Sequence, residues 1–534
     1  MKKKLLPALI VTGLIILVVI IMGITALINK YTPTKKTEDL KEYFNISSDD
    51  EVALIVNNEL SDYKAKIIDK KIYVDYKFVH DSLNSRFYWD ANENVLLYTT
   101  ASDIISAAAE SNSYSVTKQT NDFGYPIVKA TSDSALIALD YVKQYSNITF
   151  KSYDDPARIV ITSKWDEIDS ATVSKSTQVR VKGGIKSPIL KEVKKDDKIT
   201  ILDSGDKWDK VATEDGVIGY IKRKALSESK KTKLTNPDYE EETFTHIKKD
   251  KDICLAWNQV TSQSANSKVP QVISSTKGIN VMSPTWFYLN DNNGNLADIA
   301  SKDYVSYCHS QGIEVWGLFS NLENTDVDAA YVLTHTSTRT TLINQIMSAA
   351  FNYELDGVNI DFENITEAAY GDSYIEFIRE LSIKCHNNGI SLSVDVTVPA
   401  SFNKFFNRSD MAKFADYIVI MGYDEHYKGS DAGSVSSIPW VTEGVESTLK
   451  EVPADQIILG MPFYTRIWEL TPKEDDDAVT DTEDQSKYTV ASQVYSMDAA
   501  AAQLATNNAT AALDEKSGQN YAEWSVSNKL YKVW

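Results

Sequence analysis

The chain has 534 residues, which is too long for one ordinary hydrophobic core and predicts several domains. Its formal net charge of −20 and its pI near 4.9 exclude a nucleic-acid-binding class of protein, because no basic stripe is left to contact phosphates. Its three cysteines (Cys254, Cys308 and Cys385) and six histidines show no disulfide framework and no metal-ligand spacing, so we expect neither a metal site nor a cofactor.

The chain begins with a basic flank and a long apolar run. Lys2-Lys3-Lys4 precede 24 uncharged residues from Leu5 to Ile28, which are enough to span a bilayer as a helix. No small-residue cleavage pattern follows, which favours an uncleaved signal anchor over a cleaved signal peptide. Because positive flanks stay in the cytoplasm, residues 1–28 are expected to anchor the chain in the cell membrane as a single pass. The rest, starting with a polar linker at residues 29–47, would face the cell wall.

Residues 48–165 are expected to form a spacer. Strand-like runs alternate with helical ones, and a loose repeat with a period near 65 relates Ile72-Tyr73-Val74-Asp75-Tyr76 to Ile137-Ala138-Leu139-Asp140-Tyr141. This pattern resembles the stalk modules named after the amino-terminal domain of copper amine oxidases. Nothing in it indicates catalysis.

Residues 171–228 contain closely spaced strand-like runs with turns between them, which is typical of a small β-barrel. Trp208-Asp209-Lys210-Val211 and Gly216-Val217-Ile218-Gly219-Tyr220-Ile221 are similar to the signatures of bacterial SH3-like domains. That resemblance implies binding to the cell wall, although Trp208 and Tyr220 also suit core positions. The polar residues 229–249 are expected to be a second linker.

From about residue 250 onward, seven apolar runs recur with helical segments between them. This alternation predicts a parallel α/β fold, and seven consecutive units favour a (β/α)₈ TIM barrel over a doubly wound sheet. The active site of such a barrel lies at the carboxyl ends of its strands. The runs are Ile253 to Val260, Gly278 to Leu289, Ile313 to Asn321, Leu355 to Asn364, Ile390 to Pro399, Tyr417 to Tyr423, and Ile457 to Tyr464.

The fourth run is the centre of the candidate site. As a strand it places Asn359, Asp361 and Glu363 on one face. A solvated surface strand is the alternative, but the intervening residues are apolar and suit burial. When two carboxyl groups are buried next to each other, their repulsion keeps one of them protonated near neutral pH, as acid catalysis requires. Polar and aromatic residues that suit a sugar ring close the other runs, namely Trp257, Asn258, Trp286, Tyr288, Asn321, Tyr423, Asp424, Tyr464, Arg466 and Trp468.

Three motifs in this order resemble glycoside hydrolase family 18. They are Asp356-Gly357-Val358-Asn359-Ile360-Asp361-Phe362-Glu363, Met421-Gly422-Tyr423-Asp424 and Gly460-Met461-Pro462-Phe463-Tyr464-Thr465-Arg466. The likeness is to the spore-cortex-lytic and cell-wall-acting branch of that family. It implies a glycosidase that cleaves β-linked N-acetylglucosamine glycans, and the neighbouring SH3-like region favours peptidoglycan over chitin.

The resemblance also implies a retaining, substrate-assisted mechanism. Glu363 would be the general acid and then the base, Asp361 would orient the 2-acetamido group of the substrate, and Tyr423 would hydrogen-bond its oxygen. The other residues expected to bind substrate are Asp356, Asn359, Trp286, Asn321, Asp424, Tyr464 and Arg466.

Two features depart from the family pattern. Asn359 stands where the family has a carboxylate, and an amide there would hydrogen-bond Asp361 without taking its proton, so we expect a changed pH profile. Residues 467–534 read as an acidic loop, an Ala-rich helix and two strand-like pieces, resembling the family's insertion before the eighth strand. No eighth strand follows, so residues 250–534 are expected to be an incomplete barrel, with a fragment favoured over completion by another chain.

Two other functions stay open on the sequence alone. A non-hydrolytic protein that binds the cell wall through a degenerate barrel would account for the missing strand. Intact Asp361, Glu363 and Tyr423 favour an enzyme instead. A chitinase that prefers chitin is the third interpretation.

Overall fold

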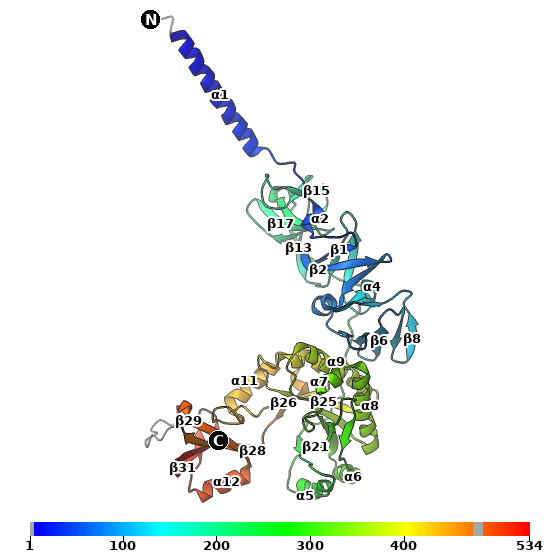
Figure 1. Ribbon diagram of the computed structural model, residues 1–534, viewed down its shortest axis with the longest axis vertical. Coiled ribbons are helices and arrows are strands. Elements are labelled where there is room, and N and C mark those ends of the chain that lie inside the picture. The colour runs from blue at the N-terminus through cyan, green and yellow to red at the C-terminus, as the bar shows by residue number, and fades with distance from the viewer. Residues whose placement is uncertain (1–4, 474–483) are drawn as a thin grey trace. The chain divides into compact units, whose positions relative to one another are not determined.

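The computed structural model describes residues 5–473 and 484–534 (Figure 1). The basic flank Lys2-Lys3-Lys4 and most of the acidic loop expected after residue 467 lie outside the described residues. The chain divides into two compact units. The first comprises Met1–Trp89, Ala107–Tyr114 and Asn121–Glu241, and the second Asp90–Ser106, Ser115–Thr120 and Glu242–Trp534.

Helix α1 (Leu5–Tyr31) is the long apolar element of the first unit (Figure 1). Its residues Leu9–Tyr31 have a mean hydropathy of 2.9, and this stretch is not buried in the fold. By length and composition α1 is able to cross a membrane, and a signal sequence near an N-terminus has the same properties. Its membrane location stays a prediction.

Two seven-stranded sheets make up most of the rest of the first unit. One is mixed, in the order β11-β12-β1-β2-β3-β10-β9, with β1 and β12 parallel. The other is antiparallel, in the order β15-β14-β18-β17-β16-β13-β19, and covers the region expected to be SH3-like. Whether the two sheets belong to the stalk and SH3-like families stays a prediction.

The strands of the mixed sheet are β1 (Glu51–Val56), β2 (Glu59–Ile68), β3 (Lys71–Asp75), β9 (Val128–Ala130), β10 (Ala135–Ala138), β11 (Thr149–Tyr153) and β12 (Arg158–Thr162). Those of the antiparallel sheet are β13 (Glu167–Thr172), β14 (Thr177–Arg180), β15 (Ile189–Val193), β16 (Lys198–Asp203), β17 (Trp208–Thr213), β18 (Ile218–Lys222) and β19 (Lys230–Lys233).

Seven parallel strands form the main sheet of the second unit, and each falls within one of the predicted apolar runs. Their order is β20-β21-β23-β24-β25-β26-β27, with parallel pairing at every step, which confirms the parallel α/β fold. Among the described residues β20 and β27 are the two edges of this sheet, so closure into an eight-stranded barrel stays a prediction. The strands are β20 (Leu255–Asn258), β21 (Val281–Leu289), β23 (Glu314–Ser320), β24 (Gly357–Asp361), β25 (Ser391–Thr397), β26 (Tyr417–Met421) and β27 (Ile457–Gly460).

Helices connect these strands and bury one face of the sheet. Val358, Ile360 and Phe362 pack on that face in the main hydrophobic core, as the alternation along the fourth run predicts. Helix α8 ends where Glu354 adopts a left-handed φ of 57°, which turns the chain back into β24. The helices are α5 (Val269–Ser274), α6 (Lys302–Ser310), α7 (Ala329–Thr334), α8 (Thr336–Tyr353), α9 (Ala368–His386), α10 (Arg408–Phe414) and α11 (Ile438–Thr448).

Residues 90–106 belong to the second unit, whereas the spacer domain at residues 48–165 stays a prediction. The hydroxyl of Thr99 donates a 2.8 Å hydrogen bond to the buried carboxylate of Glu376 on α9. Asp90 accepts hydrogen bonds of 2.7 and 2.6 Å from the N–H and hydroxyl of Thr336 at the start of α8. Because buried polar groups are costly without partners, these contacts hold the segment on the helices. Local sequence patterns carry no signal for such distant contacts.

An inserted antiparallel sheet follows β27, in the order β29-β28-β32-β31-β30, with helix α12 after β29. It contains the Ala-rich helix and the two strand-like pieces predicted for residues 467–534. Alternation along β28 puts Tyr464 and Arg466 on one face and Ile467 and Glu469 on the other. The elements are β28 (Tyr464–Pro472), β29 (Tyr488–Ser496), α12 (Met497–Thr506), β30 (Ala512–Asp514), β31 (Gln519–Val526) and β32 (Lys529–Val533).

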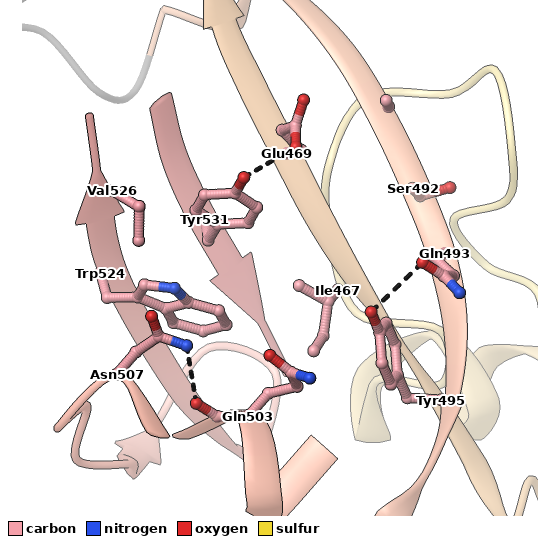
Figure 2. Close-up of a pocket in the computed structure, with 11 residues that line it drawn as sticks. Ile467, Glu469, Ser492, Gln493, Tyr495, Gln503, Asn507, Trp524, Val526 and Tyr531 are labelled. Carbon is pink, nitrogen blue, oxygen red and sulfur yellow. Dashed lines mark hydrogen bonds between the residues drawn. The ribbon is translucent and has the colours of Figure 1, made fainter. Parts of the chain in front are cut away.

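The Ile467 and Glu469 face of this inserted sheet bears a cavity of about 450 Å³ (Figure 2). The rings of Trp524 and Tyr531 stack there with their centroids 5.4 Å apart, and the hydroxyl of Tyr531 donates to Glu469 at 2.8 Å. Tyr464 lies on the opposite face of β28, so this cavity is separate from the predicted site.

Candidate active site

The face of the parallel sheet opposite the helices, called here the inner face, carries three levels of side chains. At the amino ends of the strands, Val281, Trp316 and Tyr417 form an apolar level. Gly357 lies against it, because a Cβ at this position would be 2.6 Å from the ring of Trp316. The middle level is polar, and the carboxyl ends of the strands carry the candidate catalytic groups.

Asn359 occupies the centre of the middle level, and its amide is fully hydrogen-bonded. Its Oδ1 accepts from Nε1 of Trp257 at 3.0 Å and from the hydroxyl of Ser283 at 2.9 Å. Its Nδ2 donates to the hydroxyl of Ser393 at 3.0 Å and to Oδ1 of Asp395 at 2.7 Å. An amide offers two donors and two acceptor positions, so these four bonds use all of them.

The expected hydrogen bond between Asn359 and Asp361 is therefore wrong. The amide of Asn359 points across the inner face to β25 rather than along its own strand. Oδ1 of Asp361 is buried and has no hydrogen-bond partner. Asn359 is also fully buried, and its expected part in substrate binding stays a prediction.

The carboxyl groups at this end of the sheet hold their protons more tightly than usual. Burial, together with the charges of Glu363 and Glu323, raises the pKa of Asp361 to about 7. Burial also raises the pKa of Glu363, and the charges of Asp424 and Glu323 add to the effect. A carboxyl group that stays protonated towards neutral pH is what general acid catalysis needs.

Glu363 is positioned through its backbone by Asn321. The N–H of Glu363 donates to Oδ1 of Asn321 at 3.0 Å, and Nδ2 of Asn321 donates to the carbonyl oxygen of Glu363 at 3.1 Å. Nδ2 also reaches the hydroxyl of Tyr370 at 3.4 Å. Asn321 is thus a positioning residue for Glu363, and its contact with substrate stays a prediction.

Replacing Asn321 by Ala should lower kcat about tenfold on any substrate that the chain hydrolyses, with little change in KM, because a misplaced catalytic group costs rate before it costs binding. The measurement is a steady-state comparison with the wild type. The matched control is Asn388→Ala, since Asn388 bonds the end of α9 and lies away from the site. An unchanged kcat in Asn321→Ala would contradict the positioning role.

Tyr423 follows β26 and lies beside the carboxyl groups. Its ring meets those of Trp257 and Tyr464 edge to face, at centroid distances of 6.2 and 6.1 Å. Burial raises the pKa of Tyr423, and the charges of Asp395 and Asp361 raise it further. The phenol is therefore held as a neutral hydrogen-bond donor.

Asp424 connects the second and third motifs. It adopts a left-handed φ of 60°, and its Oδ1 accepts from the hydroxyl of Tyr464 at 2.8 Å and from Arg466 at 3.4 Å. Asp424 also raises the pKa of Glu363 through its charge. The structure thus brings Asp424, Tyr464 and Arg466 together beside the carboxyl groups; their contact with substrate stays a prediction.

Trp286 lies outside this group, and its expected contact with substrate stays a prediction. Its side chain is fully buried in the main core, and its Nε1 donates to Asn266 at 2.8 Å. The pairing of β21 with β23 shifts register between Thr285 and Phe287. Trp286 nevertheless follows simple alternation: Ser283 bonds Asn359 on the inner face, whereas Met282 and Trp286 pack in the main core on the helix side.

Asp356 lies at the opposite end of β24 from Glu363, and its expected contact with substrate stays a prediction. Its Oδ2 accepts from Nε2 of His309 and from the N–H of Val315, both at 2.8 Å. These bonds fix the start of β24 to its neighbours. Contacts at the amino ends of the strands in such folds serve stability rather than chemistry.

Glu323 and Asp395 are the site residues that the sequence interpretation missed. Glu323 accepts a hydrogen bond from Ser320 and faces the two candidate catalytic carboxyl groups. Its position in a loop gave no periodic signal. Asp395 did have a periodic signal, because polar residues alternate with apolar ones along the fifth run, at Ser391, Ser393, Asp395 and Thr397.

The polar groups of the site are carboxyl, amide, phenol and guanidinium. Within residues 5–473 and 484–534, no cluster of three or more His, Cys, Asp or Glu side chains is arranged to hold a metal ion.

Fold and site together define a parallel α/β domain with buried carboxyl groups at the carboxyl ends of its strands. Residues 319–532 match the family described as glycosyl hydrolases family 18, so this part of the chain is a family 18 domain. The match begins within β23 and includes all three motifs from which the resemblance was inferred.

The chain is similar to several known proteins. An uncharacterized glycosylase of Bacillus subtilis, YvbX, is 25% identical over 194 residues, which are 34% of this chain and 55% of YvbX. The cortical fragment-lytic enzyme of Bacillus subtilis is 23% identical over 252 residues, which are 45% of this chain and 55% of that enzyme. The chain thus spans about half the length of these relatives. Among solved structures, the spore cortex-lytic enzyme SleL of Bacillus megaterium is 18% identical, with a TM-score of 0.44 over 52% of this chain and 63% of that one.

Proposed function

We propose that the chain is a glycosidase that hydrolyses β-linked N-acetylglucosamine glycans and that its substrate is peptidoglycan. The observation that carries the proposal is the convergence of Asp361, Glu363 and Tyr423 in a family 18 domain. The similarity to a cortical fragment-lytic enzyme and the resemblance of residues 171–228 to SH3-like domains both support a wall glycan.

In the proposed reaction Glu363 donates its proton to the glycosidic oxygen as the bond to the anomeric carbon breaks. The oxygen of the substrate's own 2-acetamido group attacks that carbon and forms an oxazolinium intermediate. The Glu363 carboxylate then takes a proton from water, whose oxygen opens the intermediate with net retention of configuration. The raised pKa of Glu363 supports its role as the acid.

Asp361 and Tyr423 serve the acetamido group in this scheme. The Asp361 carboxylate accepts from the acetamido N–H and stabilises the positive charge that forms there. Tyr423, a neutral donor, hydrogen-bonds the acetamido oxygen and holds it beneath the anomeric carbon. Asp424, Tyr464 and Arg466 form the neighbouring wall that binds the sugar.

The proposed location is the outer side of the cell membrane. Helix α1 anchors the chain, residues 171–228 contact the wall, and the family 18 domain acts on its glycan. The basic flank before α1 and the length of its apolar run support this orientation.

The test is to incubate the full chain, in detergent micelles, with peptidoglycan strands and with chitin oligosaccharides. We expect new reducing ends on peptidoglycan, identified as N-acetylglucosamine by mass spectrometry. Preferential cleavage of the chitin oligosaccharides would make the chain a chitinase. Binding of either glycan by a folded chain without cleavage would favour the non-hydrolytic alternative.

A further inference from the structure

We propose that Asp395 shares a proton with Asp361 and supplies, from the neighbouring strand, the carboxyl group that Asn359 lacks. The inference rests on the proposed function and deepens it, because it assigns a positioning residue to that reaction. It also gives Asp361 a partner that is able to take its proton, which the amide of Asn359 is not.

The strand register places the two aspartates at the same level of the inner face. In the parallel pair β24 and β25, Asn359 lies opposite Ser393 and Ile360 opposite Val394. Asp361 and Asp395 are the next positions along these strands, and adjacent strands are about 4.8 Å apart. Both side chains point inward, since Ile360 and Val394 belong to the core on the helix side.

Asn359 orients Asp395 towards this partnership. Its Nδ2 donates to Oδ1 of Asp395 at 2.7 Å, and Asp395 is only 1% exposed. Oδ1 of Asp361 is buried beside it with no hydrogen-bond partner. A proton held between the two carboxyl groups satisfies that oxygen, whereas two ionised carboxylates would leave it buried against a like charge.

The titratable side chains described around Asp395 are carboxyl groups and phenols. The titratable groups that act on it or feel its charge are Asp361 and Glu363 from β24 and its following loop, Tyr374 from α9 and Tyr423 after β26. Each is neutral or negative. Two carboxyl groups in such a site retain one proton between them, as like charges at this range cannot both ionise.

The shared proton has a place in the proposed reaction. Positive charge at the acetamido nitrogen stabilises the ionised form of Asp361, which contacts that group in the proposed scheme, so the neutral form of Asp395 is favoured as the intermediate forms. The proton then leaves an oxygen of Asp361 and attaches to an oxygen of Asp395, and the pair keeps a net charge of −1. Asp361 becomes the carboxylate that the intermediate needs, with no proton exchanged with solvent.

The experiment compares Asp395→Asn with the double variant Asn359→Asp/Asp395→Asn in the full chain. The double variant exchanges a carboxyl and an amide across one hydrogen bond, so it keeps the composition and charge of the wild type. The matched control is Asp416→Asn, because Asp416 is a buried aspartate at the amino end of β26 and bonds His386 there. Two readouts are used: the pH profile of kcat/KM, and infrared difference spectra that follow protonated carboxyl groups through a pH titration.

We expect Asp395→Asn to lower the higher of the two titration midpoints of the Asp361 and Asp395 pair, and the acidic limb of the kcat/KM profile, by about one pH unit or more, because the remaining carboxyl group no longer has a like charge beside it. The double variant should return both towards the wild type, and Asp416→Asn should leave both unchanged. An unmoved higher midpoint in Asp395→Asn would overturn the proposal, as would a double variant that titrates like the single one. If Asp395→Asn fails to fold, the titration midpoints of the double variant are compared with those of the wild type. We expect them to be equal.

Failure of the proposed function is distinguishable from failure of this inference. A wild-type chain that cleaves none of the glycans refutes the enzyme assignment, yet its infrared titration still reports whether one proton is shared. A chain that hydrolyses glycans with an Asp361 midpoint independent of Asp395 refutes the sharing alone.

Discussion

A Glu363→Gln variant should lose about 10³-fold or more in kcat while it still binds glycan. General acid and base catalysis by one side chain contributes about 10²- to 10⁴-fold, and Glu363 is proposed to act in both steps. Glutamine has nearly the same shape but neither donates the required proton nor accepts one from water. The two bonds from Asn321 go to the backbone of residue 363, so the substitution leaves the loop in place.

The measurement pairs steady-state hydrolysis with calorimetric binding of the same oligosaccharide. Glu443→Gln is the matched control, since Glu443 is an exposed glutamate of α11. The control should hydrolyse glycan at the wild-type rate. Turnover by Glu363→Gln within tenfold of the wild type would show that another group is the acid.

An Asp361→Asn variant should make the chain more stable at pH 8 and nearly inactive. The pKa of Asp361 is raised from 3.8 to about 7 by burial and by the charges of Glu363 and Glu323. Between about pH 4 and pH 7 the folded chain therefore keeps a proton that the unfolded chain has lost, and its free energy of unfolding falls as the pH rises. A shift of about three pH units corresponds to about 4 kcal/mol above pH 7.

Asparagine carries no charge at any pH, so the variant does not lose this free energy of unfolding as the pH rises. Urea unfolding of the second unit at pH 4.5 and at pH 8 tests the difference, with hydrolysis assayed in parallel. The free energy of unfolding of Asp361→Asn, relative to that of the wild type, should be higher at pH 8 than at pH 4.5. Asp303→Asn, which changes an exposed aspartate on α6, should follow the wild type. If the stabilities of the wild type and of Asp361→Asn depend on pH in the same way, the raised pKa of the buried Asp361 carboxyl group is contradicted.

The sequence predicted the parallel sheet because its signal is local. The five inner strands β21, β23, β24, β25 and β26 are buried on both faces or nearly so, and such strands read as short apolar runs separated by helical segments. The order of Asp361, Glu363 and Tyr423 along those runs then placed them at one edge of the sheet. Their proximity follows from parallel pairing alone, without knowledge of any side-chain contact.

What the sequence missed depends on pairing between strands or on distant segments. The inner face of β21 is identified by the hydrogen bond of Ser283 to Asn359 on another strand, and Trp286 then falls on the helix side. Asp395 was overlooked because its partner lies on another strand, although its own strand alternates cleanly. The contact of Thr99 with Glu376 joins residues 277 positions apart and leaves no local pattern.

The hydrogen bonds through Asn359 also bear on how the strands find their alignment during folding. Trp257, Ser283, Asn359 and Asp395 come from four different strands, β20, β21, β24 and β25. A slip of one residue in any of them would turn its polar side chain into the helix-packed core and leave the others without partners. Apolar inner residues tolerate such misalignment more readily, since their contacts have no preferred direction. The polar level therefore selects one strand alignment during assembly of the sheet, before any substrate is present.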